Sequence, residues 1–335
     1  MVDARILNQF DVSTGHKSVI QKGNVGETYD YGLQLWRDQL DTYVFRGTRG
    51  NLTNLVLKLV GQAAGHTQTW EFSGESGKWF VGVKPTKEHW AKQIARVDIR
   101  SLKASKTYDS NTAFPRIAYL DQAGEPKDYC QSPENFKRAE AALSPDYTKM
   151  LIATMENDGT GHFVIYNAKM INQALDDTSI DYVDLRDKQK YPCEDSFTIS
   201  NFDDLMNNSV QGYDLDNAGN IYITSQHKPN MEDHKYYPKM IKKIPYYAHE
   251  ETSQWEEVGL SAVNISGKGM HSEVESIQII GENHGYLTVA YHKLVNNKNL
   301  TILNRIYEIE WDYYFKVLEK FSSAFFLSEY NNVKS

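Results

Sequence analysis

The chain has 335 residues, of which 36 are basic and 44 acidic, so that its formal net charge is −8. This acidic balance argues against nucleic acid as a partner and against membrane insertion as a cationic amphipathic peptide. With 40% hydrophobic and 24% charged residues the composition is that of a folded globular protein, and the many aromatic residues favour β-structure.

The cysteines and the N-terminus predict neither a cofactor nor a classical export signal. Cys130 and Cys193 have no metal-ligand spacing, so we expect no metal and no disulfide-rich scaffold. Residues 1–10 lack the charged-then-apolar profile of a signal peptide. The chain also has no apolar run near the roughly 18 residues of a transmembrane segment.

In chain order, the first predicted strand is 4–12, where apolar and polar residues alternate. Repeated units of short strands follow. The first unit is predicted at 16–21, 29–35, 42–46 and 54–60, and later inner strands begin at Gln68, Glu140, Gln211 and Glu275 with near-even spacing. Each of these later strands leads into a turn rich in Gly, Asp, Asn, Ser or Pro and then into a second strand, which is typical of a β-hairpin.

Outer strands complete these units. Third strands are predicted at 93–100, 162–167, 240–246 and 305–311, and fourth strands at 115–120, 180–185 and 254–260. The last unit has only three strands, so we expect the N-terminal strand to supply its fourth.

Five four-stranded units predict an all-β fold, a five-bladed β-propeller closed by the N-terminal strand. The alternative is a two-domain β-sandwich protein, which the near-even repeat disfavours. We expect residues 1–311 to form a single propeller domain and 312–335 a short C-terminal tail, which is predicted to be helical because its apolar residues roughly follow a helical period.

The inner strands of a propeller line its central channel, so their first residues converge at one mouth. This geometry predicts a polar site from carboxylates, amides and imidazoles. The candidate ligand-binding residues are His16, His66, Gln68, Arg138, Glu140, Gln211, His271, Glu273 and Glu275.

Three hypotheses explain this polar mouth. The residues bind a ligand, most plausibly a carbohydrate; or they satisfy buried strand ends; or they form a hydrolytic site. In the hydrolytic case the catalytic candidates are Glu140 with Glu275 or Glu273, dividing acid and base or nucleophile roles as glycosidase carboxylates do. The amides of Gln68 and Gln211 disfavour catalysis, because amides do not exchange protons with a substrate.

Several long motifs stand out in the chain, including 61–72 (GQAAGHTQTWEF), 79–85 (WFVGVKP), 211–223 (QGYDLDNAGNIYI) and 271–292 (HSEVESIQIIGENHGYLTVAYH). These motifs resemble the helveticin J family, the large heat-labile bacteriocins of lactobacilli. The resemblance covers about Arg5 to Trp311, and family members usually end near the last strand, so the tail departs from the family pattern.

This resemblance implies an antibacterial protein that is secreted without a classical signal peptide and acts on related bacteria. It implies no catalytic constellation. We therefore expect the propeller to recognise a bacterial cell-surface glycan or cell-wall component, and the rivals are a cell-wall hydrolase and a non-killing glycan-binding adhesin. Because the chain is acidic, a specific receptor is the expected first contact.

Overall fold

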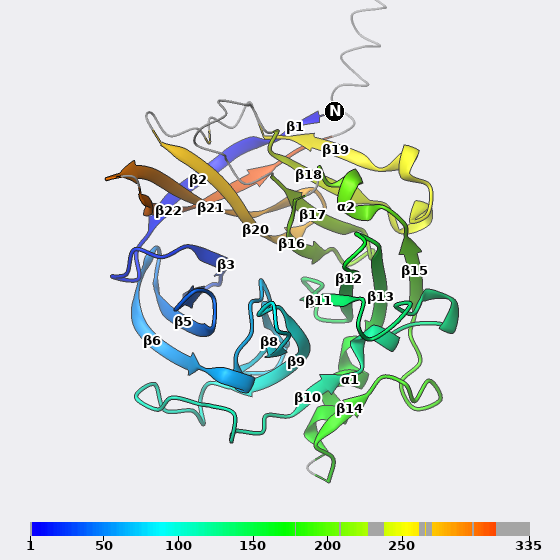
Figure 1. Cartoon of the computed structure of the whole chain (residues 1–335). Helices are drawn as coiled ribbons and strands as arrows, with labels where there is room; N and C mark the ends of the chain where they lie inside the picture. Colours follow the sequence, from blue (N-terminus) through cyan, green and yellow to red (C-terminus); the bar gives the residue numbers. More distant parts are fainter. Residues whose placement is uncertain are drawn as a thin grey trace, which may run out of the picture.

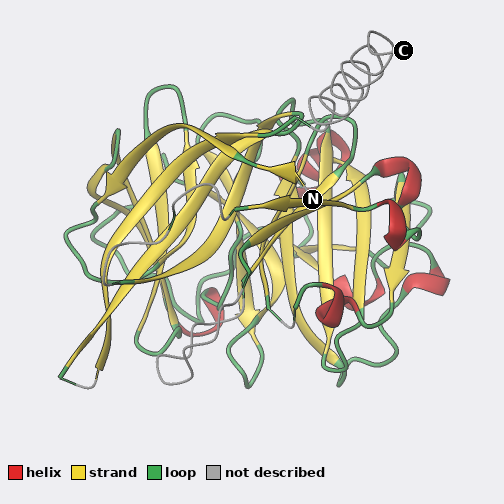
Figure 2. Cartoon of the chain, turned by 90° about the horizontal axis from the view of Figure 1, so that it is seen from above, coloured by secondary structure: helices red, strands yellow, loops and turns green. Residues whose placement is uncertain are grey.

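The computed structural model describes residues 2–177, 179–207, 209–226, 238–260, 265, 270–296 and 298–312. Five β-sheets surround a central axis, so the predicted five-bladed propeller is confirmed (Figure 1). Seen from the side, strands make up the body of the ring and the helices are short (Figure 2). None of the helices in the described part of the chain is both long and apolar enough to cross a membrane.

Each blade contains four antiparallel strands, and the first of them lies next to the axis. In blades 1 to 4 the four strands follow in chain order, whereas blade 5 takes its outer strand from the N-terminus. Blade 1 contains β3 (Ile20–Val25), β4 (Asp30–Trp36), β5 (Asp41–Thr48) and β6 (Asn51–Leu59). Blade 2 contains β7 (Trp70–Phe72), β8 (Lys78–Pro85), β9 (Ala91–Asp98) and β10 (Arg116–Ala118). Blade 3 contains β11 (Phe136–Leu143), β12 (Lys149–Glu156), β13 (Gly161–Asn167) and β15 (Asp195–Ile199). Blade 4 contains β16 (Val210–Leu215), β17 (Ile221–Ser225), β18 (Met240–Ile244) and β19 (Glu256–Gly259). Blade 5 contains β20 (His271–Gly281), β21 (His284–Val295), β22 (Lys298–Glu310) and β2 (Arg5–Val12).

The helices lie in the connections. They are α1 (Ala168–Asp176), α2 (Phe202–Leu205) and the 3-10 turns Gly61–Ala63, Leu120–Gln122, Pro126–Asp128, Tyr246–Ala248 and Thr252–Gln254. The Asn167 side chain accepts a hydrogen bond from the Met170 amide and so caps the start of α1. The predicted tail beyond Asp312 lies outside the described residues.

The N-terminus closes the ring, as predicted. β2 pairs antiparallel with β22 and becomes the outer strand of blade 5. Arg305 reinforces this pairing, because its Nε donates to Asp11 Oδ1 at 2.6 Å. The preceding β1 (Val2–Asp3) pairs parallel with β19 in blade 4, so the N-terminal residues connect two blades. This connection covers sheet edges that would otherwise be open.

One predicted strand belongs to a different blade. Residues 180–185 were expected to be the fourth strand of blade 3, but β14 (Tyr182–Asp184) pairs parallel with β10 at the edge of blade 2. β15 takes the expected place beside β13. The prediction was wrong because Val183 and Leu185 pack into a core that blades 2 and 3 share, so their apolar character does not specify the sheet.

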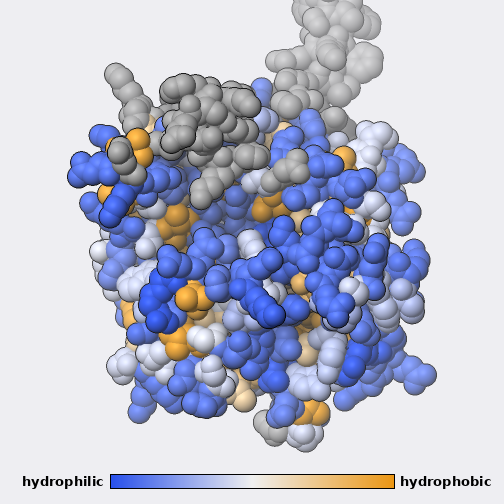
Figure 3. Space-filling view, viewed as in Figure 1, coloured by the Kyte–Doolittle hydropathy of each residue, from blue (hydrophilic) through white to orange (hydrophobic). Residues whose placement is uncertain are grey.

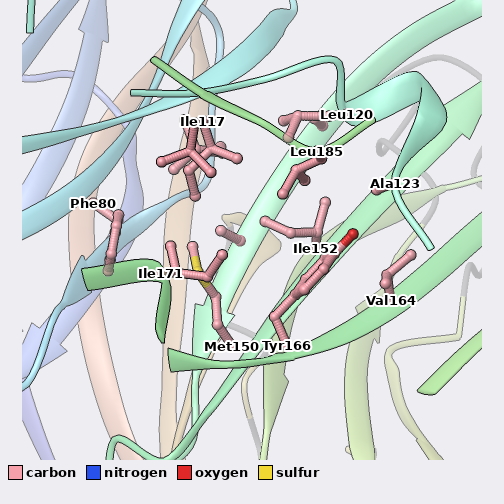
Figure 4. Packing of buried hydrophobic residues seen from close by; sticks show 14 of the residues in the cluster. Phe80, Ile117, Leu120, Ala123, Met150, Ile152, Val164, Tyr166, Ile171 and Leu185 are labelled. Atoms are coloured by element: carbon pink, nitrogen blue, oxygen red, sulfur yellow. The ribbon is translucent and has the colours of Figure 1, made fainter. Parts of the chain in front are cut away.

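The hydrophobic core is divided among the interfaces between blades. Five clusters of buried side chains each join residues of neighbouring blades. Between blades 2 and 3, Phe80, Ile117, Ile152 and Tyr166 pack together (Figure 4). Removing a fully buried side chain of this size costs about 3–5 kcal/mol, so every interface contributes substantially to holding the ring.

The connection between β16 and β17 is a hairpin turn, as predicted. Asp216 Oδ1 accepts hydrogen bonds from the amides of Ala218 and Asn220 at 2.9 and 3.0 Å. Gly219 follows with φ +91°, a conformation that glycine adopts without strain. The Asp216 carboxylate thereby folds the connection between β16 and β17.

Candidate functional site

The inner strands all begin at the same end of the axis, which we call the N-terminal mouth. Near this end several of them contain β-bulges, where one strand has an extra residue that is left out of the pairing with its neighbour. The register of β3 skips Gln21, that of β11 skips Lys137 and that of β20 skips Glu275. In β16 the register skips the pair Gln211 and Gly212. A bulge re-aims the extra residue out of the regular alternation of a strand. Four blades thereby present a polar side chain to the same place.

A cavity of about 510 Å³ lies at this mouth, a size typical of small-molecule sites. Gln21, Lys137, Gln211 and Glu275, the bulged side chains, all line it. Blade 2 contributes differently: His66 lies before β7 and forms an isolated bridge with Trp90, and both residues line the cavity. Seen along the axis, the surface of the molecule is mostly hydrophilic, with apolar residues in small separate patches (Figure 3).

Five of the nine predicted site residues line this mouth cavity. They are His66, Arg138, Gln211, Glu273 and Glu275.

Gln68 and Glu140 lie beneath the cavity and hold blades together. Glu140 Oε2 accepts hydrogen bonds from Thr67 Oγ1, the Gln68 amide and Thr69 Oγ1 at 2.9, 3.0 and 2.6 Å. Gln68 Nε2 donates to Gln211 Oε1 and to the Glu275 carbonyl at 3.0 and 3.2 Å. Burial raises the pKa of the Glu140 carboxyl. These contacts fit the second of the three hypotheses for Gln68 and Glu140, in which the polar side chains satisfy buried strand ends.

His16 and His271 do not line the mouth cavity. His16 is exposed before β3 and packs against Trp36 and Phe45, with ring centroids 4.4 and 5.6 Å away. Its predicted place at the mouth was wrong, because β3 begins only at Ile20 and Gln21 takes the position in blade 1. His271 is exposed at the first position of β20.

An aromatic and cationic group forms one side of the cavity. The His66 and Trp90 rings are stacked, with centroids 3.7 Å apart and planes inclined by 13°. The Arg138 guanidinium lies 4.5 Å from the centre of the Trp90 ring, and its Nη2 donates to the Val210 carbonyl at 3.1 Å. Burial, with smaller effects from Arg138 and His89, lowers the pKa of His66 to about 3. His66 is therefore a neutral imidazole at physiological pH.

Two glutamates and a histidine from blade 5 form another side. Glu273 and Glu275 of β20 and His292 of β21 each place a side-chain ligand atom within 4.8 Å of the others. His292 Nε2 lies 3.3 Å from Glu273 Oε2. Thr301 Oγ1, on β22, lies 3.4 Å from the other ring nitrogen, Nδ1. This is the one cluster of potential ligand atoms facing the mouth cavity among the described residues.

Charged side chains fill the axis below. Lys22, fully buried, lies 2.6 Å from Glu71 Oε1 and donates to the Ile277 carbonyl at 2.6 Å. Its Nζ is 3.9 Å from Asp214 Oδ2. Although burial alone would lower it, the pKa of Lys22 is raised overall by the neighbouring carboxylates. This ion network joins blades 1, 2, 4 and 5.

A second cavity, of about 480 Å³, lies at the opposite end of the inner strands. Its lining includes Tyr29, Trp79 and Tyr147 together with Glu71 and Asp214 of the ion network. The two mouths therefore differ: charged and amide side chains predominate at the N-terminal one, whereas aromatic side chains are as frequent as these at the opposite one.

Sequence reasoning missed several residues that line the mouth cavity. They include Gln21, Trp90, Lys137, Asp203, His292 and Thr301. The skipped positions of the bulges have no signal in a single sequence. Trp90 lies in the connection between β8 and β9, and His292 lies on β21, the second strand of its blade. The prediction considered only residues of the inner strands. His292 did carry a usable signal, because it is the last residue of the motif 271–292.

The fold and this site define a class: a five-bladed β-propeller whose axis is closed by buried ion pairs and opens at one mouth into a polar cavity. Residues 2–312 match the family model described as bacteriocin helveticin-J. Bacteriocin helveticin-J of Lactobacillus helveticus is 50% identical over 336 residues, which cover 92% of this chain and 98% of that protein. The chain belongs to the helveticin J family, which confirms the resemblance seen in the sequence.

Among solved structures, the chain is similar to the catalytic domain of a GH62 α-L-arabinofuranosidase from Coprinopsis cinerea, with 7% identity and a TM-score of 0.44 over 92% of this chain and 96% of that one. It is also similar to a GH43 β-1,3-galactosidase, with 9% identity and a TM-score of 0.45 over 93% of this chain and 96% of that one. Likeness at this level carries no argument about activity.

Proposed function

We propose that this protein is a secreted bacteriocin that kills bacteria related to its producer, and that it first binds a cell-surface glycan or cell-wall polymer in the mouth cavity. The observation that carries the proposal is the match to the helveticin J family over residues 2–312. The relative that is 50% identical bears the name of a bacteriocin.

The chemistry of the mouth cavity supports a polymer rich in hydroxyl, amide and charged groups as the ligand. Trp90 adds apolar aromatic surface to the lining, which suits contact with the apolar part of a sugar. Gln211 supplies an amide, and Lys137 and Glu275 supply charges of opposite sign, which suit a cell-wall saccharide that carries acidic or amino substituents.

The net charge of the chain supports a specific receptor. At −8 the protein has no general attraction to anionic lipid, unlike cationic antibacterial peptides. A site that recognises one polymer would supply the selectivity for related bacteria.

Growth inhibition by the purified protein, measured on related lactobacilli together with its binding to their isolated cell walls, tests the proposal. We expect Trp90→Ala to weaken cell-wall binding and killing at least tenfold, because it removes an aromatic side chain of the lining and the ring against which His66 and Arg138 pack. Trp36→Ala is the matched control, since Trp36 packs on Tyr43 away from the cavity, and it should retain both. Absence of killing at every dose by the wild type would overturn the proposal.

The other two hypotheses have separate readouts. A hydrolase that uses Glu140 loses support, because that carboxylate lies beneath the cavity and accepts hydrogen bonds from three neighbours. Glu273 and Glu275 remain as a close carboxylate pair, so a cell-wall hydrolase predicts that Glu275→Gln abolishes dye release from labelled cell walls. An adhesin predicts binding or aggregation of cells without loss of viability.

A further inference from the structure

We propose that Glu273, Glu275 and His292 form a binding site for a divalent transition-metal ion of the zinc class on the side of the mouth cavity. This site goes beyond the proposed function and does not depend on it. The spacing of the residues in the sequence predicts no metal, because the ligands come from two neighbouring strands and meet only through their pairing.

Bulges bring the ligand atoms together. In the β20 and β21 pairing the register skips Glu275, between Val274 and Ser276. The pairing of β21 with β22 has a second irregularity next to His292. The three ligand atoms lie within 4.8 Å of one another, and His292 Nε2 is 3.3 Å from Glu273 Oε2. Two ligands of a tetrahedral zinc ion, each about 2.1 Å from it, are about 3.4 Å apart.

The state of the histidine is the independent observation that points to a ligand. His292 is only 6% exposed, and its Nε2 is buried without a hydrogen-bond partner although Glu273 is close. When Nδ1–H donates to Thr301 Oγ1, which lies 3.4 Å away, the Nε2 lone pair faces the two carboxylates. A histidine oriented through its second nitrogen is the usual arrangement in a metal site. A lone pair that faces carboxylates is repulsive unless a cation or proton lies between them.

The ligand set selects the class of ion. An imidazole disfavours Mg²⁺ and Ca²⁺, which prefer oxygen ligands, whereas two carboxylates and one imidazole suit Zn²⁺ or Mn²⁺. Because all three residues line the mouth cavity, the ion would keep open coordination positions toward it. Such positions take hydroxyl, carboxylate or phosphate oxygens of a ligand.

Titration of the chelator-treated full-length protein with Zn²⁺ alone, followed by calorimetry, tests the site. We expect one ion to bind, and the melting temperature to rise with Zn²⁺ concentration. His292→Ala and Glu273→Gln should each weaken binding at least 30-fold and abolish the rise in melting temperature. Circular dichroism of the metal-free variants checks that they fold, and Glu273→Gln, which changes little in shape, keeps the test valid if His292→Ala does not fold.

His284→Ala is the matched control. His284 also lies on β21 and pairs with a glutamate, Glu308, at 3.1 Å, but it has no second carboxylate and lies outside the cavity. This variant should bind Zn²⁺ like the wild type. The proposal is overturned if the wild type binds no Zn²⁺, if His292→Ala and Glu273→Gln bind it unchanged, or if His284→Ala loses binding equally. None of these measurements depends on killing, so failure of the metal site and failure of the proposed function are distinguishable.

Discussion

In the part of the chain that the structure describes, two clusters combine buried glutamate with histidine, and they differ in what surrounds them. In blade 3, Cys130, Glu156 and His162 are enclosed: His162 Nε2 lies 2.8 Å from Glu156 Oε1 and its Nδ1 lies 3.0 Å from Thr198 Oγ1. In blade 5, Glu273, Glu275 and His292 face the mouth cavity.

In the closed cluster the hydrogen bonds to the Glu156 carboxylate are supplied partly by a loop that folds over it. The Gln131 amide donates to Glu156 Oε1 at 3.1 Å and Asn135 Nδ2 donates to Glu156 Oε2 at 2.7 Å. No such segment covers the open cluster among the described residues, and His292 Nε2 has no hydrogen-bond partner. Similar residue types are therefore enclosed by a loop in one place and line a cavity that a ligand can reach in the other.

The largest expected effect is on stability. His162→Ala should lower the free energy of unfolding by about 3 kcal/mol, because it leaves the Glu156 carboxylate buried with fewer partners. His292→Ala in metal-free buffer should lower it by no more than about 1.5 kcal/mol, because His292 Nε2 has no hydrogen-bond partner to lose. Urea denaturation measures both, and equal losses in the two variants would contradict the distinction between the clusters.

Thiol reactivity should show nearly as large an effect. Burial raises the pKa of the Cys130 thiol to about 12, so we expect its alkylation at pH 8 to be at least 100-fold slower than that of a free peptide thiol. Peptide mapping after iodoacetamide treatment measures this rate. Alkylation of Cys130 at the rate of an unfolded control would mean that the loop opens and that the cluster is not closed.

A smaller effect concerns the pH dependence of stability, which involves His66, another buried imidazole. Its pKa of about 3 in the folded protein is below the ordinary value of 6.5, so its contribution to stability is full above pH 6.5 and is lost as the pH falls toward 3. In His66→Gln the loss of unfolding free energy between pH 6.5 and pH 4 should be smaller by about 2 kcal/mol. An unchanged pH profile would assign the acid sensitivity to another group.

The smallest effect is a gain. Glu273→Gln in metal-free buffer at pH 8 should raise the free energy of unfolding by about 0.5 kcal/mol, because it removes one of two carboxylates held within 4.8 Å. Glu282→Gln is the control, since that exposed side chain pairs with Lys243 and should give no gain. A loss in Glu273→Gln would show that the open cluster is stabilising without an ion.

Much of the fold could be predicted because hairpin chemistry is local. The turn at Asp216 and Gly219 is visible in the sequence, and its repetition at near-even spacing predicts blades. The outer edges are less certain: Val183 fits the core beside either of two blades, so the sheet to which β14 belongs depends on tertiary packing.

The site was only partly predictable for a related reason. Two of the four predicted first residues of later inner strands, Gln211 and Glu275, do meet at the cavity. Bulges decide which neighbouring side chain faces the axis and which faces into the structure, and a single sequence does not reveal them. His292 was missed because its role depends on the pairing of β21 with β20.

The closure by the N-terminus also orders events during synthesis. β1 and β2 are synthesised long before their partners β19 and β22. The two N-terminal strands therefore have no partner strand while the first blades fold. The ring is completed only after residue 310 has emerged from the ribosome. Until then a nascent chain has two open sheet edges, which makes its last folding step slow and vulnerable to pairing with other chains.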